Sequence, residues 1–168
     1  MIGAPFELSH DSNNPVDMVE ELAETKGWKF TRHDECTLDL SLPGQMTSIS
    51  VGLEWQDEFS ALLVSCAMPV KIPAANYEMA AVALEKINQN LWLGHFDLSH
   101  QDMLPTFRHT LLLRMIPSGI AIDLVADVLD IAAAECNRFH STFRLAAAGD
   151  VRLHDDLNAA VFETIGEA

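Results

Sequence analysis

Basic residues are scarce in this sequence, which has 10 lysines and arginines against 25 aspartates and glutamates and a net charge of −15. Proteins bind nucleic acids largely by neutralising phosphates with Lys and Arg, and anionic membranes attract clusters of the same residues. No basic run interrupts the acidic chain. The composition therefore predicts no nucleic-acid partner and no membrane partner. A basic protein or peptide partner stays open, as does acidity that serves solubility alone.

Cysteine is also scarce. The three cysteines, Cys36, Cys66 and Cys136, are far apart, odd in number and without CxxC spacing. This pattern argues against a disulfide framework and against a cysteine-rich zinc site. We expect each cysteine to act as a small hydrophobic core residue.

Long apolar runs are missing as well. The longest apolar stretch, 120–134, is interrupted by Asp123, Asp127 and Asp130, and a membrane span needs roughly 18 uninterrupted apolar residues. Residues 1–14 lack the basic start and apolar segment of a signal peptide. We therefore expect a cytoplasmic protein. The three aspartates form a polar stripe on the helix predicted there, and we expect this stripe to face solvent.

Catalytic motifs are absent from the chain. Its eight glycines never form GxGxxG or a P-loop, and no GxSxG elbow occurs. Cys66 falls within an expected strand without a basic neighbour, which is typical of an inert thiol. We predict that the protein is not an enzyme and that it has no catalytic residue and no cofactor.

Histidine is the one chemically versatile residue that is well represented, with seven copies. His95, Asp97 and His109 lie on two neighbouring predicted strands, and two His with one carboxylate is a known metal-binding set. No HExxH or related spacing accompanies them. We predict structural histidines and no metal, with a small-molecule binder or undetected enzyme using His95, Asp97 and His109 as the alternative.

Periodicity and turn residues predict an α+β protein. Asn14-Pro15 begins a helix that Gly27 ends, and residues 38–42 and 48–55 alternate between apolar and polar positions. Because strands are grouped, we expect an antiparallel sheet with helices packed on it and one wet face. The expected order is α-β-β-β-β-α-β-β-α plus a C-terminal helix. Helices are predicted at 15–27, 73–90, 118–139 and 154–165, strands at 28–32, 38–42, 48–55, 59–68, 94–99 and 106–114, and an irregular connection at 140–153.

The chain is predicted to form one folded domain with two extensions. Residues 1–13 are expected to be a flexible tail, residues 14–147 the α+β domain, and residues 148–168 a C-terminal helical extension. No internal repeat or low-complexity segment divides the domain.

The predicted helix at 118–139 has more apolar surface than one sheet face can cover. We predict that this surplus forms a homodimer contact, and the alternative is that the C-terminal helix folds back over it within one chain. The residues predicted to bind a partner are Ala121, Leu124, Val128 and Ile131 on this helix and Leu157 and Val161 on the C-terminal helix.

Four segments carry a resemblance to a known family. They are 91–96 (LWLGHF), 107–114 (FRHTLLLR), 135–139 (ECNRF) and 163–168 (ETIGEA). In these segments and their order the chain resembles the YbjN family of bacterial proteins, from about Pro15 to the C-terminus. Within them, Gly94 permits a close backbone approach, Trp92 and Phe96 are expected to anchor a helix to the sheet, and Arg108 or His109 is expected to pair with a carboxylate.

The resemblance implies a regulatory role. The family is described as sensory transduction regulators, and its fold is similar to that of type III secretion chaperones, which are small acidic α+β dimers that bind partner segments. No catalytic residue set is carried over. The leading hypothesis is a non-enzymatic regulatory or chaperone-like module that binds a protein or peptide, and a purely structural homo-oligomer is a further alternative.

Overall fold

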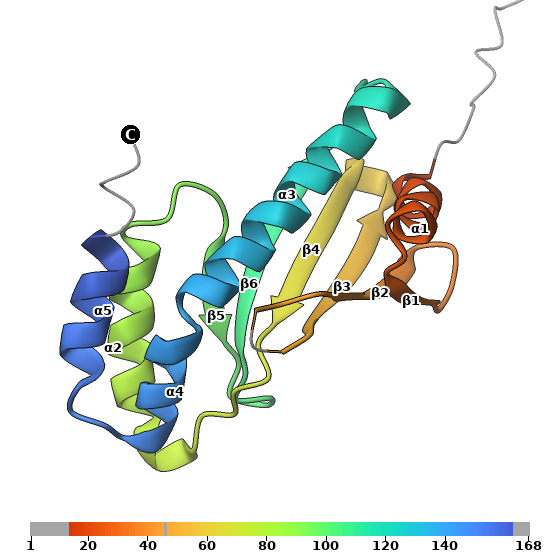
Figure 1. The fold of residues 1–168 in the computed structure, drawn as a ribbon. Coiled ribbons are helices and arrows are strands. Elements are labelled where there is room, and N and C mark those ends of the chain that lie inside the picture. Colours follow the sequence, from red (N-terminus) through yellow and green to blue (C-terminus); the bar gives the residue numbers. More distant parts are fainter. Residues whose placement is uncertain (1–13, 46, 163–168) are drawn as a thin grey trace, which may run out of the picture.

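The computed structural model describes residues 14–45 and 47–162, the last two by their backbone alone. The flexible tail predicted at 1–13 and the segment 163–168 of the family resemblance therefore lie outside the described residues. Within these ranges the chain forms six strands and five α-helices (Figure 1). The strands are β1 (Lys29–Arg32), β2 (Thr37–Leu42), β3 (Ile49–Gln56), β4 (Ala61–Ala67), β5 (His95–Leu98) and β6 (Pro105–Leu112). The helices are α1 (Pro15–Lys26), α2 (Tyr77–Asn88), α3 (Ser118–Arg138), α4 (His140–Ala148) and α5 (Leu153–Phe162), with short 3-10 turns at Asp57–Phe59 and Ala74–Asn76.

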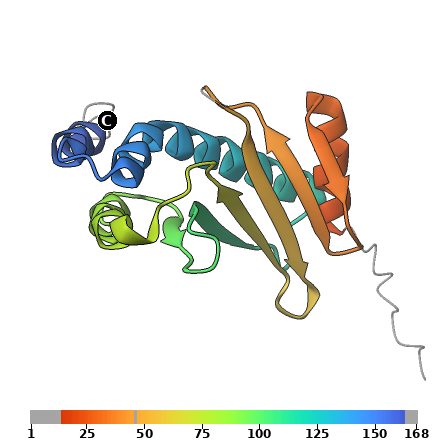
Figure 2. The same cartoon turned by 90° about the horizontal axis from the view of Figure 1, so that it is seen from below.

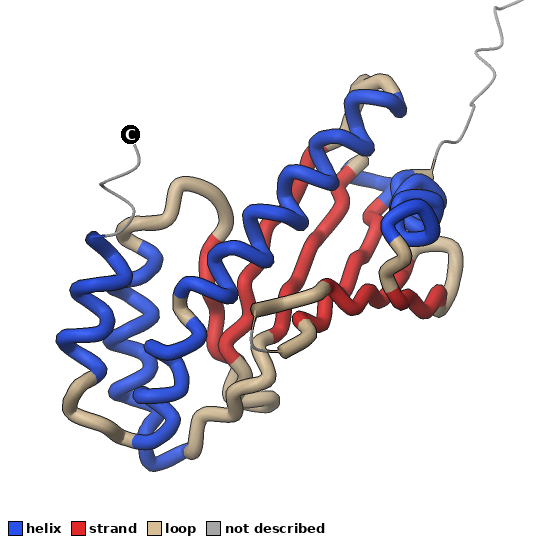
Figure 3. The backbone as a smooth tube through the Cα atoms, in the orientation of Figure 1, coloured by secondary structure: helices blue, strands red, loops and turns tan. Residues whose placement is uncertain are grey.

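The six strands form one antiparallel sheet in the order β1-β2-β3-β4-β6-β5 (Figure 3). Its register follows from the alternation in the sequence, because pairing must bring apolar side chains to one face. Leu40 lies opposite Val51, and Val51 lies opposite Cys66. All three side chains are buried. The predicted α+β class and antiparallel sheet are confirmed.

Two helices cover one face of the sheet. Figure 2 shows α3 and α1 on the same side, and α1 packs against α3. The buried stripe of α3 includes Val125, Leu129, Ala132 and Cys136, which recur at helical spacing. No described helix lies over the opposite face. By strand alternation that face is formed largely by polar and charged side chains, such as Ser41, Ser50, Ser65 and Thr110.

The remaining helices form a group at the β5 edge of the sheet, where α2 contacts β5 and α5 packs against α2 and α4 (Figure 1). The prediction of an irregular connection at 140–153 is wrong, because α4 occupies most of it. Phe139, Phe143 and Ala146 fall on one helical face and are fully buried. The helix ends only at Gly149, which takes the left-handed conformation with φ of 65°.

The first helix has the boundaries that its capping residues predict. The side chain of Asn14 accepts a hydrogen bond from the Val16 amide at 3.0 Å, and Gly27 ends α1 with φ of 69°. Arg32 on β1 then ties the strand to the helix through ion pairs with Asp17 and Glu20. No described helix is long and apolar enough to span a membrane.

The segment 91–96 behaves partly as expected. Gly94 has φ of 68°, and a Cβ there would lie 2.4 Å from the ring of Phe107, so the chain does approach the sheet closely at this point. Phe96 is buried and packs against Phe107, as predicted. Trp92 is 97% exposed, so the expectation that it anchors the helix to the sheet is wrong. The tight turn at Gly94 directs Phe96 inward but leaves Trp92 in the loop before it.

Candidate partner-binding surface

Four exposed apolar residues lie on the segments around the turn from β6 into α3. We call the set of Phe59, Leu112, Met115 and Ile116 the apolar corner. Leu112 pairs with Ala61, the first residue of β4, so the residues just before β4, including Phe59, lie near the end of β6. Large exposed apolar groups on one part of a surface are typical of an interaction site.

The backbone of the corner is held in a defined shape. The Leu113 amide donates to the Ser60 carbonyl at 2.8 Å, and the Ile116 amide donates to the Leu113 carbonyl at 3.1 Å. Met115 between them has φ of 60°, a left-handed conformation that is uncommon outside glycine. Its side chain is 95% exposed. The structure therefore presents Met115 outward, although Leu113 beside it is buried.

An apolar line on α3 lies beside the corner. Ile120, Leu124 and Ile131 are 54%, 36% and 39% exposed, and their spacing places them within a narrow sector of the helix that borders the buried stripe. We call this line the α3 ridge. It extends over about 16 Å at 1.5 Å per residue. Figure 1 shows the first turns of α3 reaching beyond the end of the sheet, so this part of the ridge is open to a partner.

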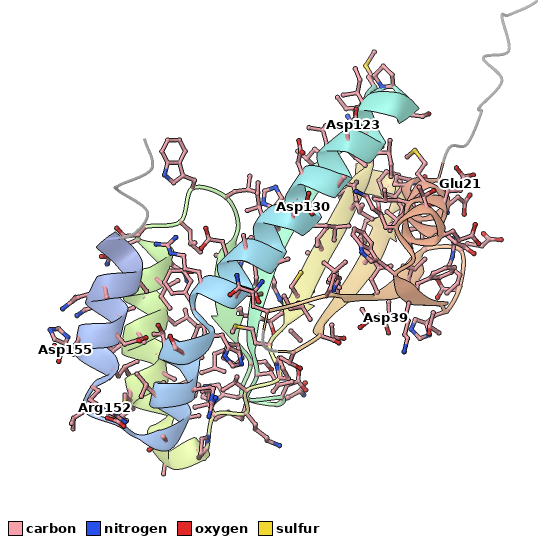
Figure 4. The ribbon with its side chains drawn as sticks, viewed as in Figure 1. Glu21, Asp39, Asp123, Asp130, Arg152 and Asp155 are labelled. Atoms are coloured by element: carbon pink, nitrogen blue, oxygen red, sulfur yellow. The ribbon has the colours of Figure 1, made fainter. Side chains whose placement is uncertain are left out.

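Three carboxylates accompany the α3 ridge. Asp123, Asp127 and Asp130 are exposed, as predicted for a solvent-facing stripe, and Figure 4 shows Asp123 and Asp130 along the helix. None of the three forms an ion pair within the described part of the chain. The ridge is therefore an apolar line with an uncompensated negative border.

A cleft of about 910 Å³ adjoins the corner and shares Met115 and Ile116 with it. It lies between α1, the β1–β2 loop, the β3–β4 turn and the β6–α3 loop, with Met18 and Trp55 among its apolar lining. Arg32 on its wall is already engaged by Asp17, Glu20 and the carbonyls of Asp34 and Glu35. The cleft offers apolar contact, carboxylates and the exposed cation Arg114, whereas Arg32 is engaged in holding the structure.

The residues predicted to bind a partner divide between core and surface. Ala121 and Val128 are buried inside the protein, whereas Leu124 and Ile131 are exposed on the α3 ridge. Leu157 is buried against the α2 side. The side chain of Val161 lies outside the described part of the chain. Partner binding itself stays a prediction. Of the six residues predicted to take part, Leu124 and Ile131 are exposed and could contact a partner.

The C-terminal helix α5 does not cover the α3 ridge. Its Leu157 lies beside Met79 and Ala83 of α2, and Arg138 at the end of α3 donates two hydrogen bonds to the Ala160 carbonyl, at 2.9 and 2.6 Å. Asp156 also accepts a hydrogen bond from Thr142 on α4 at 2.7 Å. These contacts keep α5 with α2 and α4. The intrachain cover considered from the sequence is therefore not formed by the described helix.

The histidine set does not converge on one point. His95 lies opposite Arg108, while His109 lies opposite the buried Val64, so the two histidines belong to opposite faces of the sheet. Asp97 instead forms an ion pair with Arg108 at 3.8 Å, which confirms the predicted pairing of Arg108 with a carboxylate. The described residues hold no group of three or more His, Cys, Asp or Glu side chains that could bind a metal.

Two of the three cysteines belong to the core as predicted, whereas Cys36 is only half-buried, on the wall of the cleft, so the prediction for it is wrong. Cys66 on β4 and Cys136 on α3 are buried. Burial, and then the neighbouring thiol, raises the pKa of Cys66, while burial followed by the charge of Glu135 raises the pKa of Cys136 to about 12. Nucleophilic chemistry requires the thiolate. Neither group is suited to it.

Sequence reasoning missed the apolar corner and Ile120. Phe59, the first residue of the strand predicted at 59–68, lies instead in the 3-10 turn. The spacing of Ile120 and Leu124 by four residues was the available signal for the ridge. The corner had no comparable signal, because it joins residues distant in sequence.

These features define a class of α+β protein. It has a single six-stranded antiparallel sheet, helices over one face of the sheet and an exposed apolar surface. A solved structure of similar fold is described as "Crystal structure of YbjN, a putative transcription regulator from E. coli". It has 14% sequence identity and a TM-score of 0.52, and the match covers 75% of this chain and 91% of that one.

Residues 15–145 match the YbjN family, described as "Putative bacterial sensory transduction regulator". The chain belongs to this family, as the resemblance implied, and the α-β-β-β-β-α-β-β-α order followed by further helices agrees with the YbjN fold. No curated protein sequence matches the chain.

Proposed function

We propose that this protein is a non-enzymatic regulator that binds a segment of another protein through the α3 ridge and the apolar corner. The observation that carries the proposal is the exposure of Ile120, Leu124 and Ile131 in one line on α3, beside the corner. Such a line matches the way in which amphipathic segments are recognised, by apolar anchors on one helical face. Membership of a family of regulators supports the same role.

An enzymatic role has less support. His95 and His109 point to opposite faces of the sheet, and Asp97 is paired with Arg108. Burial, and then the charge of His95, lowers the pKa of His109. The surroundings of His109 therefore stabilise its neutral imidazole, but neither His95 nor Asp97 is placed to act with it as a second catalytic group.

Comparative capture tests the proposal. The full chain is immobilised and incubated with lysate of the source bacterium, beside an Ile120→Asp, Leu124→Asp variant. A matched control carries Val82→Asp and Val151→Asp, which change two exposed apolar residues of the α2–α5 side in the same way. We expect mass spectrometry to identify a protein that the unmodified chain and the control retain and the ridge variant loses.

The opposite pattern would contradict the proposal. If the ridge variant and the unmodified chain retain the same proteins in the same amounts, the ridge is not the binding surface. Thermal unfolding of all three proteins shows whether the substitutions leave the fold intact. We expect that they do, because the substituted positions are exposed.

A further inference from the structure

We infer that the partner of the α3 ridge is a basic amphipathic segment, with apolar side chains that contact the ridge and Lys or Arg side chains that meet its aspartates. This inference rests on the proposed function and specifies the chemistry of the partner. It comes from the placement of charge around Ile120, Leu124 and Ile131.

The apolar line and the carboxylates occupy adjoining sectors of one helix. With about 100° between successive residues, Asp127 falls at the edge of the ridge sector next to Ile120, and Asp123 and Asp130 lie further round on the same side. Any segment that lies on the ridge therefore has three carboxylates within reach. Asp127 stands at the edge of the contact, where an uncharged partner would remove part of its water without replacing it.

The chain offers these carboxylates no cation of its own along α3. No Lys or Arg occurs from residue 115 to residue 137, and the first cation after this stretch, Arg138, is engaged by Glu135 and the Ala160 carbonyl. The negative charge of the ridge is thus available to a partner. Complementary charge speeds the encounter and rejects partners of the wrong sign.

Charge also separates the possible occupants of the ridge. A second copy of this chain would place Asp123, Asp127 and Asp130 against the same residues across a two-fold axis, which costs free energy. A nucleic acid or an anionic membrane would meet the same repulsion. A segment with apolar and basic residues at helical spacing satisfies both features of the ridge.

A synthetic peptide tests the inference directly. The probe is a labelled amphipathic helix with Leu on one face and Lys on the other, and its counterpart has Glu in place of Lys. Fluorescence anisotropy measures the binding of each to the full chain and to an Asp123→Asn, Asp127→Asn, Asp130→Asn variant. The control variant, Glu21→Gln, Glu24→Gln, Asp155→Asn, removes three exposed acidic charges from α1 and α5.

We expect the Lys peptide to bind the unmodified chain and the Glu peptide not to bind. The α3 variant should bind the Lys peptide about 10-fold more weakly, and the control variant no more than about 2-fold more weakly, because each lost surface ion pair is worth a fraction of a kcal/mol. The salt dependence of binding should fall in the α3 variant more than in the control.

Several results would overturn the inference. Equal loss in both variants would mean that overall charge alone attracts the peptide. Binding of the Glu peptide, or no binding of the Lys peptide to the unmodified chain, would exclude a basic partner.

An Ile120→Ser, Leu124→Ser variant distinguishes failure of the basic-partner inference from failure of the proposed function. If it loses peptide binding while the α3 aspartate variant keeps it, the ridge binds segments without selecting charge. In that case the inference is wrong and the proposed function stands. The proposed function fails separately, when the capture experiment shows no dependence on the ridge.

Discussion

Asn88, in the last turn of α2, makes two hydrogen bonds with the backbone of Phe96 on β5. Its side-chain amide donates to the Phe96 carbonyl at 2.9 Å, and its side-chain oxygen accepts from the Phe96 amide at 2.8 Å. Because β5 is an edge strand, these backbone groups have no neighbouring strand to bind. Asn88 therefore closes part of the sheet edge and fixes α2 against it.

Replacing Asn88 by Ala should destabilise the protein. The change leaves the Phe96 amide and carbonyl without their partners, and an unsatisfied, part-buried backbone group costs about 1–3 kcal/mol. Urea unfolding followed by circular dichroism measures the free energy of unfolding. Gln89→Ala, at the exposed neighbouring position, is the control and should change it by less than about 0.5 kcal/mol. Equal stability of the two variants would mean that water replaces Asn88 at no cost.

Replacing Gly94 by Ala should also destabilise the protein, by at least about 2 kcal/mol. The left-handed φ strains any L-residue, and the new Cβ would lie 2.4 Å from the Phe107 ring and 2.7 Å from the Arg108 carbonyl oxygen. Gly119→Ala is the control, because a Cβ there meets nothing within 4 Å. In the helix this change should be neutral or stabilising. A Gly94→Ala protein as stable as the control would show that the turn relaxes freely.

Stability should fall as the pH drops below about 6.5, the ordinary pKa of histidine. Burial, followed by the charges of His95 and Arg144 respectively, lowers the pKa of His109 and of His140. The unfolded chain then binds protons that the folded chain does not, so the stability present above this pH is lost below it. Burial raises the pKa of Glu135, although the charge of Arg138 lowers it. A raised carboxyl pKa makes the folded chain bind more protons than the unfolded one, so Glu135 increases stability as the pH falls further.

Urea unfolding at a series of pH values from about 7.5 to about 5.5 measures this dependence. A His109→Gln, His140→Gln variant should show a flatter slope over that range than the unmodified chain. The same slope in both proteins would mean that other groups carry the dependence.

The homodimer stays a prediction, and the structure adds a condition to it. A two-fold contact through the α3 ridge brings Asp123, Asp127 and Asp130 of both copies together, so dimerisation through this ridge should strengthen as salt screens them. Light scattering at about 0.05 M and about 0.5 M salt measures the mass of the particle. A monomer under both conditions contradicts the homodimer. A dimer that persists in the Ile120→Asp, Leu124→Asp variant uses another surface.

The sequence by itself determined most of the fold. Asn14-Pro15 and Gly27 define α1, because capping and chain reversal are local properties of these residues. The alternation of residues 38–42 and 48–55 determined which side chains face the core, since a strand repeats every two residues. The exposed aspartates of α3 were also predictable, because they interrupt an apolar helix at a regular spacing.

Only the tertiary structure decided the binding surface. Ala121 and Val128 share the apolar character of Leu124 and Ile131, but neighbouring elements cover the first pair and leave the second exposed. Trp92, although apolar, lies outside because the turn at Gly94 directs only the residues after it into the core. Which apolar residues stay exposed depends on what packs over them, and that depends on contacts between residues far apart in the chain.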